Sequence, residues 1–166
     1  YGARPIAVSD CANYGDVYGG QYAGGIFGYE SSNGDYGGVA ATATNSANYG
    51  ALEVGDKENG LVGEWIGYLG SNPKRPKENT FGAWNSFFTT TNIVGRSAGY
   101  ETQIVNCQTA QDAGYTAGRA RKALSAWAEE NGYEPWKQGK LGDKVYPELG
   151  IFCEKPYVDG FMLFIR

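Results

Sequence analysis

Glycine and tyrosine are concentrated in the first 70 residues of this chain. Glycine makes up 26 of the 166 residues, roughly twice the usual share of about 7%. Residues 1–70 hold 16 of these glycines and eight of the 13 tyrosines. Ordering glycine costs more backbone entropy than ordering any other residue. We therefore expect this segment to be fixed only if its tyrosines bury area against the rest of the chain or against a partner.

Charge divides the chain in a similar way. Residues 1–56 carry one basic and six acidic side chains, whereas residues 57–166 carry 13 basic and 12 acidic ones. Asn-Tyr-Gly occurs at 13–15 and again at 48–50, which we interpret as a compositional echo and not as a repeat of fixed period. These patterns predict an acidic Gly/Tyr-rich segment, 1–56, packed on a main helical and mixed part, 57–166. The length suits a single domain over 1–166.

One helix is predicted over about 109–131. Thr109 and Asp112 have the spacing of a capping box, and Gly132 supplies a stop signal. Between them an apolar stripe recurs at spacings of three and four, formed by Ala110, Ala113, Ala117, Ala120, Leu124 and Trp127.

The remaining elements are predicted to be short. Leu61 to Leu69 is a short helix or a buried strand between Gly60 and Gly70, and the aromatic residues near Trp84 form part of a core. Residues 60–95 are expected to hold one or two short helices, and the C-terminal FMLFIR at 161–166 a buried strand or short helix. The expected fold class is α+β: a loop-rich, irregular single domain with few short strands.

Composition excludes several functions. A net charge of -4 and a pI of about 4.9 argue against a nucleic-acid binder, and no apolar run is long enough for a transmembrane segment. The chain has no histidine, the most common general base and metal ligand. The pairs Glu53 with Glu64 and Glu129 with Glu130 could act as acid and base, but each is more simply a solvated surface acid. We therefore expect neither an enzyme nor a metal site.

The three cysteines leave two interpretations open. Any two of them could form a disulfide, which would leave one thiol buried in the core. Alternatively, each thiol holds something other than cysteine, because each has carboxylates, aromatic residues or bases nearby. Thiols, carboxylates, cations and aromatic residues together suit a large conjugated cofactor with carboxylate tails. The candidate cofactor-binding residues are Cys11, Cys107, Cys153, Asp10, Asp112, Arg119 and Asp159.

In character, with Tyr/Gly-rich segments and isolated cysteines as in SDC at 9–11 and NC at 106–107, the chain resembles the chromophore-bearing linker polypeptides of red-algal phycobilisomes, the phycoerythrin gamma-type subunits. The resemblance implies bilins (phycoerythrobilin or phycourobilin) joined by thioethers to the three cysteines, with Asp10, Asp112 and Asp159 as pyrrole partners. It also implies a non-catalytic light-harvesting linker that organises phycobiliprotein subunits in a large assembly, in the chloroplast at the stromal face of the thylakoid.

Two alternatives compete with this hypothesis. The chain could be a secreted or cell-envelope structural domain with one disulfide that assembles through its Tyr/Gly surfaces. It could also bind sugars, since Trp65, Trp84, Trp136 and the tyrosines could stack on a saccharide. Core packing is the simpler prediction for these three tryptophans.

Overall fold

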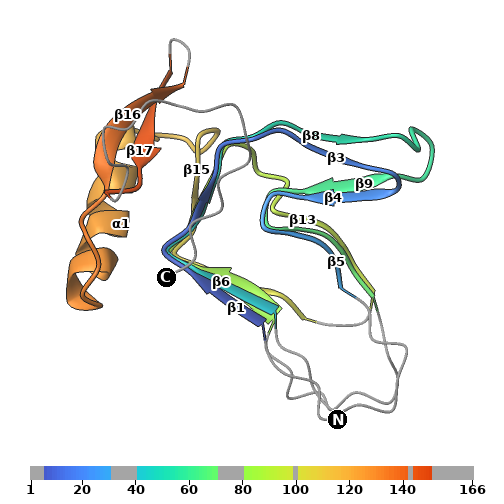
Figure 1. Cartoon of the computed structure of the whole chain (residues 1–166), viewed down its shortest axis with the longest axis horizontal. Helices are drawn as coiled ribbons and strands as arrows, with labels where there is room; N and C mark the ends of the chain where they lie inside the picture. Colours follow the sequence, from blue (N-terminus) through green and yellow to red (C-terminus); the bar gives the residue numbers. More distant parts are fainter. Residues whose placement is uncertain (1–5, 31–40, 71–80, 99–100, 142–143, 151–166) are drawn as a thin grey trace.

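The computed structural model describes residues 6–30, 41–70, 81–98, 101–141 and 144–150. In these residues the chain winds through successive coils whose strands lie over one another (Figure 1). Every pairing between coils is parallel. The molecule is therefore a parallel β-solenoid, which carries a helix and a hairpin on one side.

The main sheet has the strand order β1-β6-β11-β14, one strand from each of four coils. Its strands are Ile6–Ser9 (β1), Ala41–Thr44 (β6), Phe81–Trp84 (β11) and Gln103–Val105 (β14). Each of these strands is followed by a corner and a second strand. The second strands form a parallel sheet in the order β15-β12-β7-β2, with bounds Ala12–Asn13 (β2), Ala47–Asn48 (β7), Phe87–Phe88 (β12) and Gln108–Thr109 (β15).

The first two coils extend into an arm, to which the later coils contribute fewer strands. Its strands are Val17–Gly19 (β3), Tyr22–Gly24 (β4), Phe27–Glu30 (β5), Leu52–Val54 (β8), Leu61–Gly63 (β9) and Ile66–Leu69 (β10). The third coil contributes only Val94–Ser97 (β13), so that β10 lies between β5 and β13. In register, Ile66 pairs with both Phe27 and Val94.

The expected α+β class with few short strands is wrong, because the described chain is rich in parallel sheet. The short helices expected within 60–95 are likewise absent from its described part, where β9 to β13 stand instead. Solenoid strands of two to four residues bury themselves against neighbouring coils, so their stability depends on partners far away in sequence. Asn13 pairs with Asn48, so the two Asn-Tyr-Gly triplets are equivalent positions of a structural repeat and not a compositional echo.

The predicted helix exists but is shorter than expected. It spans Ala117–Glu130 (α1), with Thr116 as its N-cap. Thr109 and Asp112 do hydrogen-bond to each other, yet they form a turn directly after β15. Gly114 then adopts a φ of 80°, which keeps the intervening residues out of the helix. Gly132, with a φ of 77°, stands just beyond the helix end as expected.

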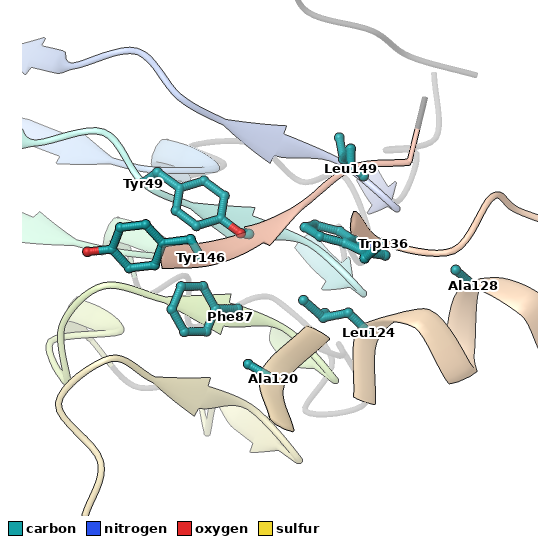
Figure 2. Packing of buried hydrophobic residues seen from close by; sticks show 9 residues of the cluster. Tyr49, Phe87, Ala120, Leu124, Ala128, Trp136, Tyr146 and Leu149 are labelled. Carbon is teal, nitrogen blue, oxygen red and sulfur yellow. The ribbon is translucent and has the colours of Figure 1, made fainter. Parts of the chain in front are cut away.

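The helix and the hairpin of Lys137–Leu141 (β16) and Lys144–Glu148 (β17) cover the second-strand sheet (Figure 1). The buried cluster between them combines four aromatic residues with alanines and leucines (Figure 2): Ala47, Tyr49, Phe87, Ala120, Leu124, Ala128, Trp136, Tyr146 and Leu149. The Tyr49 hydroxyl donates to the carbonyl of Pro147 and so ties the second coil to the hairpin.

A second core fills the interior of the coils: Ala41, Ala43, Trp65, Ile66, Leu69, Phe81, Ala83 and Phe88. Its alanines belong to β6 and β11 of the main sheet, whereas Ile66 and Leu69 belong to β10 of the arm. At Gly67 a Cβ would lie 2.6 Å from the carbonyl oxygen of Ala23, and at Gly95 one would lie 2.3 Å from that of Gly67. Much of the glycine in the arm is thus required by close backbone approach. The segment 161–166 lies outside the described residues.

Candidate functional site

Cys11 and Cys107 occupy the same corner of the first and fourth coils. The residues that follow them, Ala12 and Gln108, belong to one ladder of paired positions. In the two coils between, the same corner position holds Ser46 and Ser86. Neighbouring parallel strands lie roughly 4.8 Å apart, so three steps separate the two cysteines by about 14 Å, beyond the reach of a disulfide. A bridge between Cys11 and Cys107 is therefore excluded, while Cys153 and Asp159 lie outside the described residues.

Both corner thiols are partly buried. The Cys107 sulfur lies 3.3 Å from the carbonyl oxygen of Ala83 and packs against the interior core. Burial raises the pKa of Cys107 to about 11. The Cys11 sulfur lies 3.1 Å from the Ser9 carbonyl, and burial together with the charge of Asp10 raises the pKa of Cys11. Both side chains are thus thiols at neutral pH, and the thiolate is the reactive form.

Directly before each of these corner residues stands an Asp or Asn in the left-handed backbone region. Their φ angles lie between 46° and 55°, at Asp10, Asn45, Asn85 and Asn106. Asn45 Nδ2 donates to Asp10 Oδ1 at 2.8 Å, and Asn85 Nδ2 donates to Asn45 Oδ1 at 2.8 Å. Asp10 Oδ1 also accepts from the indole Nε1 of Trp136 at 2.9 Å. This row of side chains is the corner ladder, and Asp10 begins it.

A second polar network joins the first three coils. Asn13 Nδ2 donates to Asn48 Oδ1 at 2.8 Å, and Asn48 Nδ2 donates to Glu64 Oε2 at 2.5 Å. The other carboxylate oxygen, Glu64 Oε1, accepts from the Thr89 hydroxyl at 2.7 Å. Glu64 is only 3% exposed, so its prediction as a solvated surface acid is wrong. At the next position of the ladder Phe88 replaces asparagine, and the carboxylate of Glu64 supplies the acceptor that Asn48 would otherwise lack.

An open pocket of about 460 Å³ lies beside the fourth coil. It brings together three of the residues predicted as cofactor ligands: Cys107, Asp112 and Arg119. The Asp112 carboxylate is engaged locally, because its two oxygens accept from the backbone N–H and the hydroxyl of Thr109. Asp10 and Cys11 are not part of this pocket lining.

The outer surface of the arm carries a stack of tyrosines. The rings of Tyr22, Tyr29 and Tyr68 lie with centroids 4.9 to 5.6 Å apart and within 17° of parallel. Tyr29 and Tyr68 are in register on β5 and β10, and Arg96 on β13 pairs next to Tyr68. Tyr29 is 52% exposed. We call Tyr22, Tyr29, Tyr68 and Arg96 the tyrosine face. The sequence shows three tyrosines at 22, 29 and 68, but only the pairing of the coils shows that their rings lie together.

Two of the three tryptophans predicted to stack on a saccharide cannot contribute to such a surface. Trp65 is 0% and Trp136 is 3% exposed, which confirms core packing for both, and Trp84 is partly buried in β11. Stacking of a saccharide on Trp65 or Trp136 is excluded by their burial.

Comparison with known proteins finds no matching family model, no similar curated protein and no similar solved structure. Within the described ranges, no helix has the length and apolar character needed to cross a bilayer.

Proposed function

We propose that this chain is a non-catalytic binding module in which a β-solenoid presents the tyrosine face to an extended saccharide. The observation that carries this proposal is the near-parallel, partly exposed stack of Tyr22, Tyr29 and Tyr68 with Arg96 beside it. The tyrosines were part of the predicted sugar-stacking surface, whereas Trp65 and Trp136 are excluded from it by their burial.

The chemistry of this face suits a sugar. Aromatic rings offer an apolar surface together with a polar hydroxyl, which matches the apolar and hydroxylated faces of a pyranose. Arg96 adds a planar set of donors for hydroxyl or carboxylate oxygens. Backbone pairing fixes the strands that carry Tyr29, Tyr68 and Arg96, so little conformational entropy is lost when a ligand binds.

Other polar groups have structural roles that leave them little capacity for binding. Asp10 and Asn45 hydrogen-bond along the corner ladder, and Glu64 is held by Asn48 and Thr89. The tyrosine face therefore stands out as a polar-aromatic surface on the described outer strands.

The test is affinity electrophoresis of the chain against a panel of soluble neutral and acidic polysaccharides, followed by calorimetry on any that retard it. Tyr29→Ala and Tyr68→Ala should each weaken binding at least about tenfold, equivalent to about 1.4 kcal/mol. Tyr133→Ala is the matched control, because Tyr133 stacks on Trp127 beside the helix. Absence of binding across the panel, or equal loss in the control, would overturn the proposal.

A second candidate is the bilin-bearing linker, favoured by the pocket that gathers Cys107, Asp112 and Arg119. Its volume of about 460 Å³ lies within the range of small-molecule sites. In that case purified native protein would absorb visible light and carry added mass that Cys107→Ser removes. A colourless protein with the unmodified polypeptide mass would rule this candidate out.

A further inference from the structure

The outermost strands of the main sheet are β1 in the first coil and β14 in the fourth. Each pairs with one neighbour, so each has one backbone edge that no other described strand pairs with. Such edges are templates for pairing with another chain.

Both edge strands also leave core-type side chains uncovered. Ile6 stands in register with Ala41 and Phe81, which are 1% and 0% exposed, yet Ile6 itself is 50% exposed. At the opposite end, Ile104 stands in register with the fully buried Ala83 and is 36% exposed. In a solenoid such positions are covered by the next coil, and terminal coils need a cap. The interior core is thus open at both ends of the described coils.

We propose that a second copy of this chain covers these ends, with β14 of one copy pairing against β1 of the next. Both strands already take part in parallel pairing, so this contact would extend the sheet in the same sense. It would also place the exposed Ile104 of one copy against the first coil of the next, where Ile6 lies.

Strand direction favours this head-to-tail arrangement. Two β1 strands that met through a two-fold axis would run antiparallel to each other. Contact between two β14 strands through a two-fold axis would be antiparallel, unlike any pairing between coils in the molecule.

A head-to-tail contact that does not close into a ring builds open chains. Sedimentation velocity of the wild-type chain over a concentration series should therefore show dimers and larger species that grow with concentration. Ile6→Lys and Ile104→Lys should each remain monomeric alone, because each lacks one half of the contact. Their equimolar mixture should form a 1:1 dimer and no larger species, because one variant keeps an intact β14 edge and the other an intact β1 edge.

Ala126→Lys is the control, since it adds the same charge on an exposed position of α1. It should assemble like the wild type, and circular dichroism should show that all variants are folded. If either lysine variant is unfolded, Ile6→Ser and Ile104→Ser replace them. A wild-type chain that stays monomeric at every concentration, or a single variant that still dimerises alone, would overturn the proposal.

Discussion

The side-chain amide of Asn45 donates a 2.8 Å hydrogen bond to Oδ1 of Asp10, 35 residues earlier in the chain. Both residues have left-handed backbone conformations, with φ of 49° and 50°. Asn85 repeats the same bond to Asn45 from the third coil. A conformation that asparagine tolerates and most other residues do not is thus combined with a side chain that joins adjacent coils. The corner ladder therefore fixes both the bend of each coil and its register on the next.

Replacing Asn45 separates these two contributions. Asn45→Ala loses the ladder bonds and places a β-carbon in the left-handed region, whereas Asn45→Gly loses only the bonds. We expect Asn45→Ala to lower the free energy of unfolding by about 3 kcal/mol. Asn45→Gly should be less destabilising, by about 1–2 kcal/mol, because glycine has no Cβ to strain the left-handed backbone. Urea denaturation of both variants measures the difference. Equal stability of the two would mean that backbone conformation at this corner is unimportant.

Close packing of the coils makes Gly67 intolerant of a side chain. A Cβ there would lie 2.6 Å from the carbonyl oxygen of Ala23 and 2.7 Å from that of Gly28, both backbone atoms. Gly67→Ala should therefore cost about 3 kcal/mol or more, or prevent folding. Gly118→Ala is the control, because a Cβ at this helical position meets nothing within 4 Å. It should raise stability by up to about 1 kcal/mol; thermal denaturation showing similar effects for the two would contradict the close approach.

Glu64 and Glu53 are two carboxylates with opposite surroundings. Glu64 is buried and accepts from Asn48 and Thr89, whereas the exposed Glu53 pairs with Lys57 at 2.9 Å. Glu64→Ala removes the acceptor of the partly buried Thr89 hydroxyl and leaves the buried Asn48 amide with only the Gly50 carbonyl, and we expect it to cost about 2–4 kcal/mol. Glu53→Ala should change stability by less than about 0.5 kcal/mol. Chemical denaturation checks both, and a tolerated Glu64→Ala would show that the buried network contributes little.

Stability should decline in alkaline solution. Burial raises the pKa of Cys107 from 9.0 to about 11 and that of Tyr115 from 10.0 to about 12, and it also raises the pKa values of Tyr14 and Tyr49. The unfolded chain therefore releases these protons at lower pH than the folded one. Stability is fully present below about pH 9 and is lost progressively above it.

Urea midpoints measured between pH 8 and pH 11 test this expectation, and absorbance of ionised tyrosine should rise together with unfolding. Cys107→Ala should reduce the loss of stability per pH unit between about pH 9 and pH 11, because burial of the thiol is the main cause of the raised pKa of Cys107. A midpoint that stays constant or rises over this range would contradict the burial of these groups.

The helix could be predicted from sequence because its signals are local. Ala120 and Leu124 are buried as the stripe predicted, and Gly132 follows the helix end. The start was misplaced because Thr109 and Asp112 form their hydrogen bonds in a turn after β15, whereas Thr116 is the N-cap. A capping-box pattern identifies a local hydrogen-bonding arrangement. Whether a helix starts there depends on the residues that follow, and here Gly114 with its positive φ delays the start to Ala117.

The solenoid was missed because its repeat is irregular and its strands are short. The clearest signal is a corner of Asp or Asn followed by Cys or Ser, at 10–11, 45–46, 85–86 and 106–107. These corners lie 35 and then 40 residues apart before the last coil shortens, so no fixed period appears. The tyrosine face was hidden for the same reason, since Tyr29 and Tyr68 meet only when β5 and β10 pair.

Contacts between alanine methyl groups test the parallel stacking of coils most directly. Ala12 pairs with Ala47 in β2 and β7, and the buried Ala43 pairs with Ala83 in β6 and β11. Nuclear Overhauser spectroscopy on alanine-methyl-labelled protein should show cross-peaks between the members of both pairs, 35 and 40 residues apart. Absence of both cross-peaks, with antiparallel contacts between the same strands in their place, would contradict the β-solenoid.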